Sequence, residues 1–249
     1  MEHKNKIIDK SKYYIHNFSV NDDRKNSKED ILLPTWINGC SRCYLISSSG
    51  GGKTNLICNL LSSMLDFDTL FYYSPETSLY QPKLERLIQL LMIKKSYSDR
   101  KKSVDYNFTS NFDELDLNEL DKSKRNIIVL DDALSLNKEQ MLKMDNIMTT
   151  SRHKNVNVFV MSQSFFTIPK VSRSNFNMIF LFKVSSGFQL RAIYQDLNID
   201  IDFNEFKRLY NISQETPYNF ILCDKHTDIP NKIQIRNGFF PFENNDDEQ

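Results

Sequence analysis

Short apolar segments alternate with longer amphipathic ones along the chain. Short apolar segments predict strands at 42–46, 69–73, 126–130, 156–161, 178–182 and 219–223, and the alternating segment 232–236 predicts a further strand. Apolar residues at helical spacing predict helices at 53–65, 79–93, 138–152, 187–197 and 204–210. The polar stretch 94–111 is predicted to be a loop, and 112–120 a short acidic helix. The chain therefore predicts strands and helices in alternation.

This alternation favours an α/β fold with a mostly parallel central sheet flanked by helices on both faces. We expect one folded domain over residues 31–242, a polar N-terminal arm over 1–30 and an acidic tail over 243–249. Right-handed crossovers gather the carboxyl ends of parallel strands at one edge of the sheet, where ligands bind. Three polar motifs follow predicted strands at such ends.

The first motif concentrates half of the six glycines of the chain in one place, Gly50–Gly52. It reads S-S-S-G-G-G-K-T from Ser47 to Thr54 and fits the phosphate-binding pattern G-x-x-x-x-G-K-[ST], except that Ser47 replaces the first glycine. Lys53 is expected to reach the β- and γ-phosphates of ATP, and the Thr54 hydroxyl to bind Mg²⁺. The residues predicted to contact the nucleotide are Ser48, Ser49, Gly50, Gly51, Gly52, Lys53, Thr54 and Asn55.

The second motif is an acidic pair, Asp131-Asp132, directly after the apolar run at 126–130. Asp131 is predicted to join the Mg²⁺ shell. Asp132 is predicted to be the base that orients or deprotonates the attacking water. The alternative is a pair of solvated acids at a strand end, which the phosphate loop upstream disfavours.

The third motif places Gln163 after the strand at 156–161, where it can contact the γ-phosphate. Arg152 precedes the same strand. It is either a cation that stabilises a helix C-terminus or an arginine finger that reaches into a neighbouring subunit's site. Arg173 is the rival candidate for the finger.

Positive and negative side chains balance at 32 each, so binding to DNA requires a local basic surface. The candidate cluster is Lys94, Lys95, Arg100, Lys101 and Lys102. It predicts either a pore loop that grips phosphates or a solvated charged loop. The pair Phe165-Phe166 is expected to pack in the core or an interface, in preference to stacking on bases.

Two further classes of function find little support. Cys40 and Cys43 form a single C-x-x-C pair without the second pair or histidines that a zinc site requires, so reduced thiols are favoured over a metal or redox role. No apolar run approaches the roughly 20 residues that a membrane helix needs.

The residues from Arg152 onward resemble a known group of proteins. The series is R-H-K-N-V at 152–156, S-Q at 162–163, I-P-K at 168–170, R-x-N at 173–175 and M-I-F-L-F-K at 178–183. With the phosphate loop and the acidic pair, it is similar to the poxvirus-type genome-packaging ATPases of the FtsK–HerA superfamily, over about residues 35–242.

The resemblance implies a RecA-like P-loop NTPase core that forms a ring homo-oligomer, a hexamer or pentamer, with the arginine finger at Arg152. It implies Mg²⁺-dependent ATP hydrolysis that drives double-stranded DNA into a capsid. Capsid or portal vertex proteins become expected partners. The expected location is the host cytoplasm, in viral factories, with the virion as a second location.

Other functions remain open at this stage. A HerA-like helicase or DNA-processing translocase carries an N-terminal β-barrel, for which the roughly 40 residues before the first strand are too few. A cell-division DNA pump carries membrane segments, and a small-molecule kinase needs an arginine-rich lid. A non-catalytic nucleotide-binding protein has no need of Asp131, Asp132 and Gln163.

Overall fold

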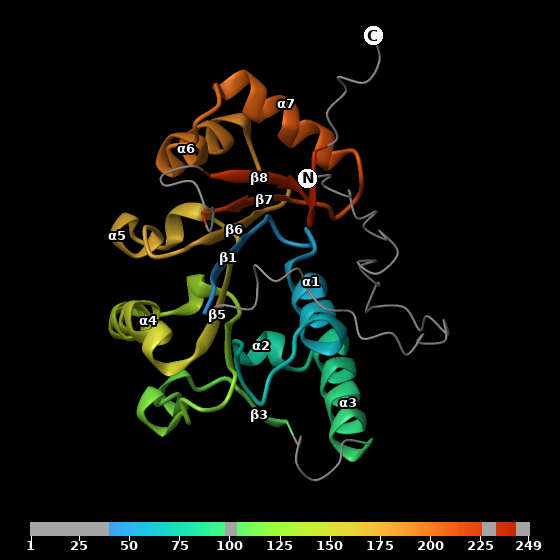
Figure 1. The fold of residues 1–249 in the computed structure, drawn as a ribbon, viewed down its shortest axis with the longest axis vertical. Helices are drawn as coiled ribbons and strands as arrows, with labels where there is room; N and C mark the ends of the chain where they lie inside the picture. The colour runs from blue at the N-terminus through green and yellow to red at the C-terminus, as the bar shows by residue number, and fades with distance from the viewer. Residues whose placement is uncertain (1–39, 98–103, 226–232, 243–249) are drawn as a thin grey trace, which may run out of the picture.

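The computed structural model describes residues 40–97, 104–225 and 233–242 (Figure 1). Its centre is a nine-stranded sheet of order β3-β2-β4-β5-β1-β6-β7-β8-β9. The strands are β1 Arg42–Ile46, β2 Thr69–Tyr73, β3 Asp105–Thr109, β4 Asn126–Leu130, β5 Val156–Ser162, β6 Met178–Leu181, β7 Ile221–Asp224, β8 Gln234–Asn237 and β9 Phe240–Pro241.

The six strands β1 to β6 pair in parallel, and β7, β8 and β9 extend the sheet in antiparallel fashion. The prediction of an α/β fold with a mostly parallel sheet is confirmed. In β1, Cys43 and Leu45 face one buried cluster while Tyr44 and Ile46 face the other. Both faces are covered, which is why these strands read as continuous apolar runs.

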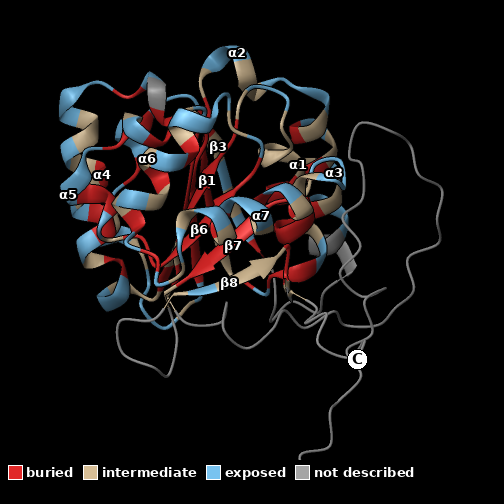
Figure 2. Cartoon of the chain, turned by 90° about the horizontal axis from the view of Figure 1, so that it is seen from above, coloured by how far each residue is buried: buried red, intermediate tan, exposed pale blue. Residues whose placement is uncertain are grey.

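Helices cover both faces of the sheet (Figures 1 and 2). Apolar residues of α1 and α3 pack in one cluster, and those of α4, α6 and α7 pack in the other. The α-helices are α1 Lys53–Asn59, α2 Glu76–Leu79, α3 Pro82–Tyr97, α4 Lys138–Thr150, α5 Lys170–Arg173, α6 Gly187–Leu197 and α7 Phe203–Gln214.

The parallel pairing brings the three motifs to one edge of the sheet. Ile46 lies beside Ser162, and Leu130 beside Val160, so β1, β4 and β5 end together. The Ser47 amide donates a hydrogen bond to the Ser162 carbonyl at 3.3 Å. The residues that follow these strands are therefore neighbours in space.

Several predicted elements were wrong in detail. The predicted loop 94–111 holds the end of α3 and the strand β3, whose polar sequence D-Y-N-F-T fits an edge strand that is covered less than the central ones. The predicted helix 112–120 is two single 3₁₀ turns, capped by Asn111 and Asp116. The helix after the phosphate loop ends in a π-helical turn, Leu60–Met64.

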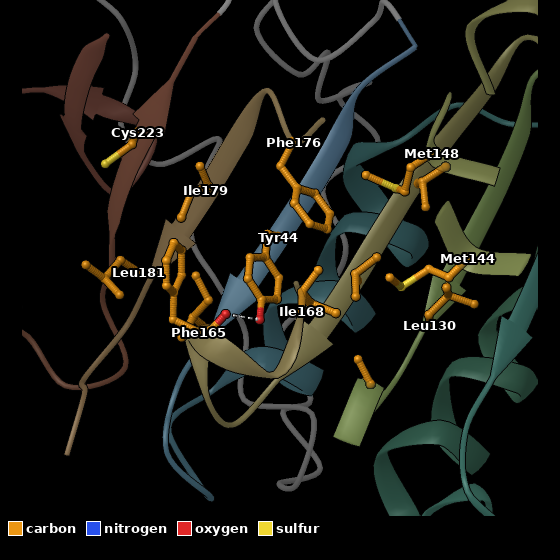
Figure 3. Close-up of a cluster of buried hydrophobic side chains, with 14 of the residues drawn as sticks. Tyr44, Leu130, Met144, Met148, Phe165, Ile168, Phe176, Ile179, Leu181 and Cys223 are labelled. Carbon is orange, nitrogen blue, oxygen red and sulfur yellow. Dashed lines mark hydrogen bonds between the residues drawn. The ribbon is translucent and has the colours of Figure 1, made fainter. Parts of the chain in front are cut away.

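One core cluster positions the loop after β5 (Figure 3). The Tyr44 ring stacks on Phe176 with 4.7 Å between ring centroids. Its hydroxyl donates to the carbonyls of Ser164 and Phe165 at 2.9 and 3.0 Å. This buried tyrosine therefore holds the backbone directly after Gln163.

Some expectations fall outside the described residues: the arm 1–30, the domain start at 31–39 and the tail 243–249. All four cysteines are described, and none forms a disulfide. In the described parts of the chain, no helix is both long and apolar enough for a membrane span.

Candidate nucleotide-binding site

A cavity of about 190 Å³ opens at the carboxyl edge of the sheet. Its lining includes six residues of the phosphate loop together with the acidic pair and Gln163. The full lining is Ser49, Gly50, Gly51, Gly52, Lys53, Thr54, Ser78, Gln81, Lys83, Asp131, Asp132 and Gln163. Segments predicted separately from the sequence thus meet at one site.

Three lining residues were missed by sequence reasoning. Ser78 lies in α2, Gln81 between α2 and α3, and Lys83 in the first turn of α3. The Lys83 carbonyl faces the Cys58 thiol of α1 at 3.8 Å, so α3 begins beside the phosphate-loop helix. The only signal in the sequence that could have pointed to these residues is that their segment follows the carboxyl end of β2, at the edge of the sheet where ligands bind.

The backbone of the loop explains its glycines. Gly50 and Gly52 have φ of 74° and 109°, a left-handed conformation that glycine adopts without steric cost. A Cβ added at Gly51 would lie 1.7 Å from the Ser47 Oγ. Ser47 therefore replaces the usual glycine because Gly51 leaves room for its side chain, whose hydroxyl donates to the Ser48 carbonyl at 2.8 Å.

Gly51→Ala should weaken ATP binding by about 10- to 100-fold, as overpacking costs about 1–3 kcal/mol and each 1.4 kcal/mol is tenfold. Ser47→Gly removes the clashing atoms, so the double variant Ser47→Gly/Gly51→Ala should regain most of the affinity. Titration calorimetry with an ATP analogue measures all three variants. Equal weakening in the single alanine variant and the double variant would contradict the proposed contact.

Lys53 lies across the loop that precedes it. Its Nζ donates to the carbonyls of Ser47 and Ser48 at 2.8 and 3.4 Å. Burial lowers the pKa of the ammonium, while Asp131 and Asp132 act to raise it. The lysine thus lines the cavity near enough to both carboxylates to interact with them electrostatically.

Asp131 is buried, with 9% of its surface exposed. Its Oδ2 accepts hydrogen bonds from the Tyr72 hydroxyl at 3.3 Å and the Ser74 hydroxyl at 3.5 Å. Burial raises the pKa of this carboxyl to about 6, against the lowering effect of Lys53. A cation bound here would stabilise the ionised form.

Asp131→Asn is therefore expected to stabilise the protein in the absence of nucleotide and Mg²⁺. The rise of the Asp131 pKa from 3.8 to about 6 corresponds to about 3 kcal/mol, at 1.36 kcal/mol per pKa unit. The ionised carboxyl destabilises the folded state, so the gain is full above about pH 6 and vanishes as the pH falls below 4. Urea unfolding in EDTA at pH 4 and pH 7.5 checks this. A variant no more stable than wild type at pH 7.5 would count against it.

Asp132 has an unusual backbone, with φ 56° and ψ 68°. Its carbonyl accepts hydrogen bonds from the Ser135 amide at 3.0 Å and the Ser135 hydroxyl at 2.8 Å, which hold this conformation. Its Oδ1 is buried, and no hydrogen-bond partner for it lies in the described chain. An unpaired buried acceptor is costly, which favours a role with a ligand or water.

The two candidate arginines lie in different environments. Arg173 is 8% exposed, and its guanidinium forms a bidentate pair with Asp196 at 2.8 and 3.0 Å. Arg152 is exposed in the 3₁₀ turn Ser151–Lys154, and its carbonyl lies 3.9 Å from the Cys40 thiol, just before β1 begins. Arg152 therefore lies at the edge of the sheet opposite its own phosphate loop.

The predicted DNA-binding cluster is only partly described. Lys94 and Lys95 lie in the last turns of α3, while Arg100, Lys101 and Lys102 fall outside the described residues. Phe165 is fully buried, as the packing interpretation predicted, and Phe166 is 46% exposed.

The oxygen ligands suit a magnesium ion. The Thr54 hydroxyl and both carboxylates of the acidic pair line one cavity. Within the residues that the structure describes, no three histidines, cysteines or carboxylates form a metal-binding group. One or two carboxylates, completed by phosphate oxygens and water, is the usual protein share of a Mg²⁺ site.

Known proteins of similar fold include a viral packaging enzyme. The structure of B204, the DNA-packaging ATPase from Sulfolobus turreted icosahedral virus, matches with a TM-score of 0.51 and 13% identity, covering 80% of this chain and 97% of that one. B204 from Sulfolobus turreted icosahedral virus 2, in complex with AMPPCP, matches with a TM-score of 0.51 and 13% identity, covering 78% and 96%. At this identity the similarity shows a shared fold.

Sequence comparison identifies the family. A comparison with curated proteins returns no match. The family model for the poxvirus A32 protein matches residues 37–220, well over half of the chain. The match confirms the resemblance to poxvirus-type packaging ATPases, and the chain belongs to the poxvirus A32 protein family.

Proposed function

We propose that this P-loop ATPase uses Mg²⁺-dependent ATP hydrolysis to drive double-stranded DNA into a viral capsid. The observation that carries the proposal is the convergence of Lys53, Asp131, Asp132 and Gln163 on the cavity under the phosphate loop. Membership of the poxvirus A32 protein family supports it, as does the fold shared with a DNA-packaging ATPase.

The residues of the cavity have separate roles in hydrolysis. Amides of the loop and the N-terminus of α1 bind the phosphates, and Lys53 neutralises charge on the β- and γ-phosphates. Thr54 and Asp131 would hold Mg²⁺, which neutralises charge on the phosphates when bound. The Oδ1 of Asp132, which has no hydrogen-bond partner among the described residues, is available to accept a proton from the attacking water. Gln163, which lines the same cavity, would contact the γ-phosphate.

Arg152 suggests that neighbouring subunits share each site. It lies exposed on the edge opposite its own loop, so a role as an arginine finger would require the cavity of another subunit. Such a head-to-tail contact closes into a ring when its rotation permits. Mixing Arg152→Ala subunits with Lys53→Ala subunits should therefore restore part of the lost ATPase activity. Mixtures as inactive as either variant alone would contradict a role in trans.

The partners of the motor follow from the same proposal. Duplex DNA is bound through its phosphates, for which Lys94, Lys95, Arg100, Lys101 and Lys102 remain the candidates. Replacing all five by glutamine should flatten the salt dependence of DNA binding. A capsid or portal vertex protein is the second proposed partner, with viral factories of the host cytoplasm and the virion as locations.

DNA-stimulated ATP hydrolysis is the direct test. Phosphate release by wild type should rise when duplex DNA is added, and Lys53→Ala should release no phosphate with or without DNA. Activity indifferent to DNA would overturn the proposed translocase. Capsids that fill normally when the protein is depleted would favour a DNA-processing role over packaging.

A further inference from the structure

Tyr218 lies against the phosphate loop in an unusual conformation. Its φ is 64°, in the left-handed region that costs a bulky residue free energy. A Cβ on Gly52 would lie 3.3 Å from the Tyr218 Cβ and 3.6 Å from its Cδ1. Yet 67% of the tyrosine surface is exposed. A large aromatic side chain is therefore held on the loop without being buried by the rest of the fold.

Tyr218 lies on the side of the loop opposite the catalytic groups. In the sheet order β4-β5-β1-β6-β7, the acidic pair and Gln163 follow β4 and β5. Tyr218 comes shortly before β7, on the other side of β1. A triphosphate whose γ-phosphate faces the acidic pair must direct its nucleoside toward β6 and β7, because the loop binds the phosphates between the two sides.

A second hollow, of about 300 Å³, lies on this side. One of its lining residues contacts the phosphate loop directly, because the Ser48 amide donates to the Lys183 carbonyl at 3.2 Å. The Gln214 side chain connects it to the segment after Tyr218 by donating to the Asn219 carbonyl at 3.4 Å. Its lining is Lys183, Val184, Tyr210, Asn211, Gln214 and Glu215. The amides and the carboxylate of α7 and its end offer hydrogen-bond partners for a base edge or a ribose.

We propose that Tyr218 and this hollow form the nucleoside subsite, in which the Tyr218 ring stacks on the base of the bound nucleotide. The inference rests on the proposed ATPase function. It adds an explanation of how the site would bind a nucleotide more tightly than a polyphosphate that lacks a nucleoside. Every nucleobase has a π-face, so the stack supplies affinity, while the polar groups of the hollow read the base edge or the ribose.

The test compares two ligands on three proteins. Tyr218→Ala should weaken ATP binding by about 10-fold, the scale of an aromatic–base stack. Binding of tripolyphosphate, which lacks a nucleoside, should be unchanged. Tyr218→Phe keeps the ring and should bind ATP as wild type does. Titration calorimetry gives each affinity, and thermal melting shows whether each variant is folded.

The outcomes separate this inference from the proposed function. If wild type binds neither ATP nor tripolyphosphate, the proposed function fails. If wild type binds ATP and Tyr218→Ala binds it equally well, only the nucleoside subsite is overturned. If Tyr218→Ala weakens both ligands equally, the tyrosine supports the loop backbone and the stacking role is also overturned.

Discussion

Asp132→Asn is expected to lower kcat for ATP hydrolysis by about 10²- to 10⁴-fold, the usual contribution of a general base, while ATP still binds. The amide that replaces the carboxylate has nearly the same shape but cannot accept a proton from water. Asparagine also tolerates the left-handed backbone that Asp132 adopts, so the fold should be unaffected. Steady-state phosphate release and calorimetric ATP binding measure the two effects.

A matched control is available in the same chain. Asp145 in α4 also has a buried Oδ1 without a described hydrogen-bond partner, but it does not line the cavity. Asp145→Asn should hydrolyse ATP at the wild-type rate. Equal hydrolysis by Asp132→Asn and wild type would remove Asp132 from its assigned role, and equal losses in both variants would point to a general effect of removing a buried charge.

Arg173→Ala is expected to lower the free energy of unfolding by about 3–5 kcal/mol, the cost of removing one partner of a buried ion pair. Asp196 would be left without its bidentate partner, and the Ile168 carbonyl would lose a donor at 2.5 Å. The guanidinium also lies over the rings of Phe165 and Phe166, at 4.6 and 5.1 Å from their centroids. Urea unfolding of the variant and wild type gives the difference.

Arg152→Ala is the contrasting variant, because Arg152 is exposed. Its free energy of unfolding should stay within about 0.5 kcal/mol of wild type, as for most surface substitutions, while the ATPase activity of the assembled protein falls. The reverse pattern, with Arg173→Ala stable but inactive and Arg152→Ala fully active, would make Arg173 the arginine finger.

Most of the fold was predictable because it depends on local patterns. The run N-I-I-V-L is buried at all five positions of β4. A strand that helices cover on both faces is recognised in the sequence by such a continuous apolar run. The strand β3 was missed for the converse reason. At the edge of the sheet, D-Y-N-F-T remains partly exposed, so its composition resembles that of a loop.

The residues of the candidate site likewise fall into those that the sequence predicted and those that only the structure revealed. A glycine loop between strand and helix, and carboxylates directly after a buried strand, are adjacent in the chain and so could be found by spacing alone. Ser78, Gln81 and Lys83 carry no such pattern. They reach the cavity because α2 and the start of α3 fold over the edge of the sheet.

The sequence by itself determined the phosphate loop, the acidic pair, the alternation of most strands and helices, and the family resemblance. Each depends on backbone conformation or burial, which neighbouring residues specify. Only the tertiary structure decided which side chains meet. It showed that Gly51 makes room for Ser47, that Arg173 is paired with Asp196, and that Tyr218 lies on Gly52. Contacts between residues far apart in the chain depend on how whole elements pack, which no local pattern encodes.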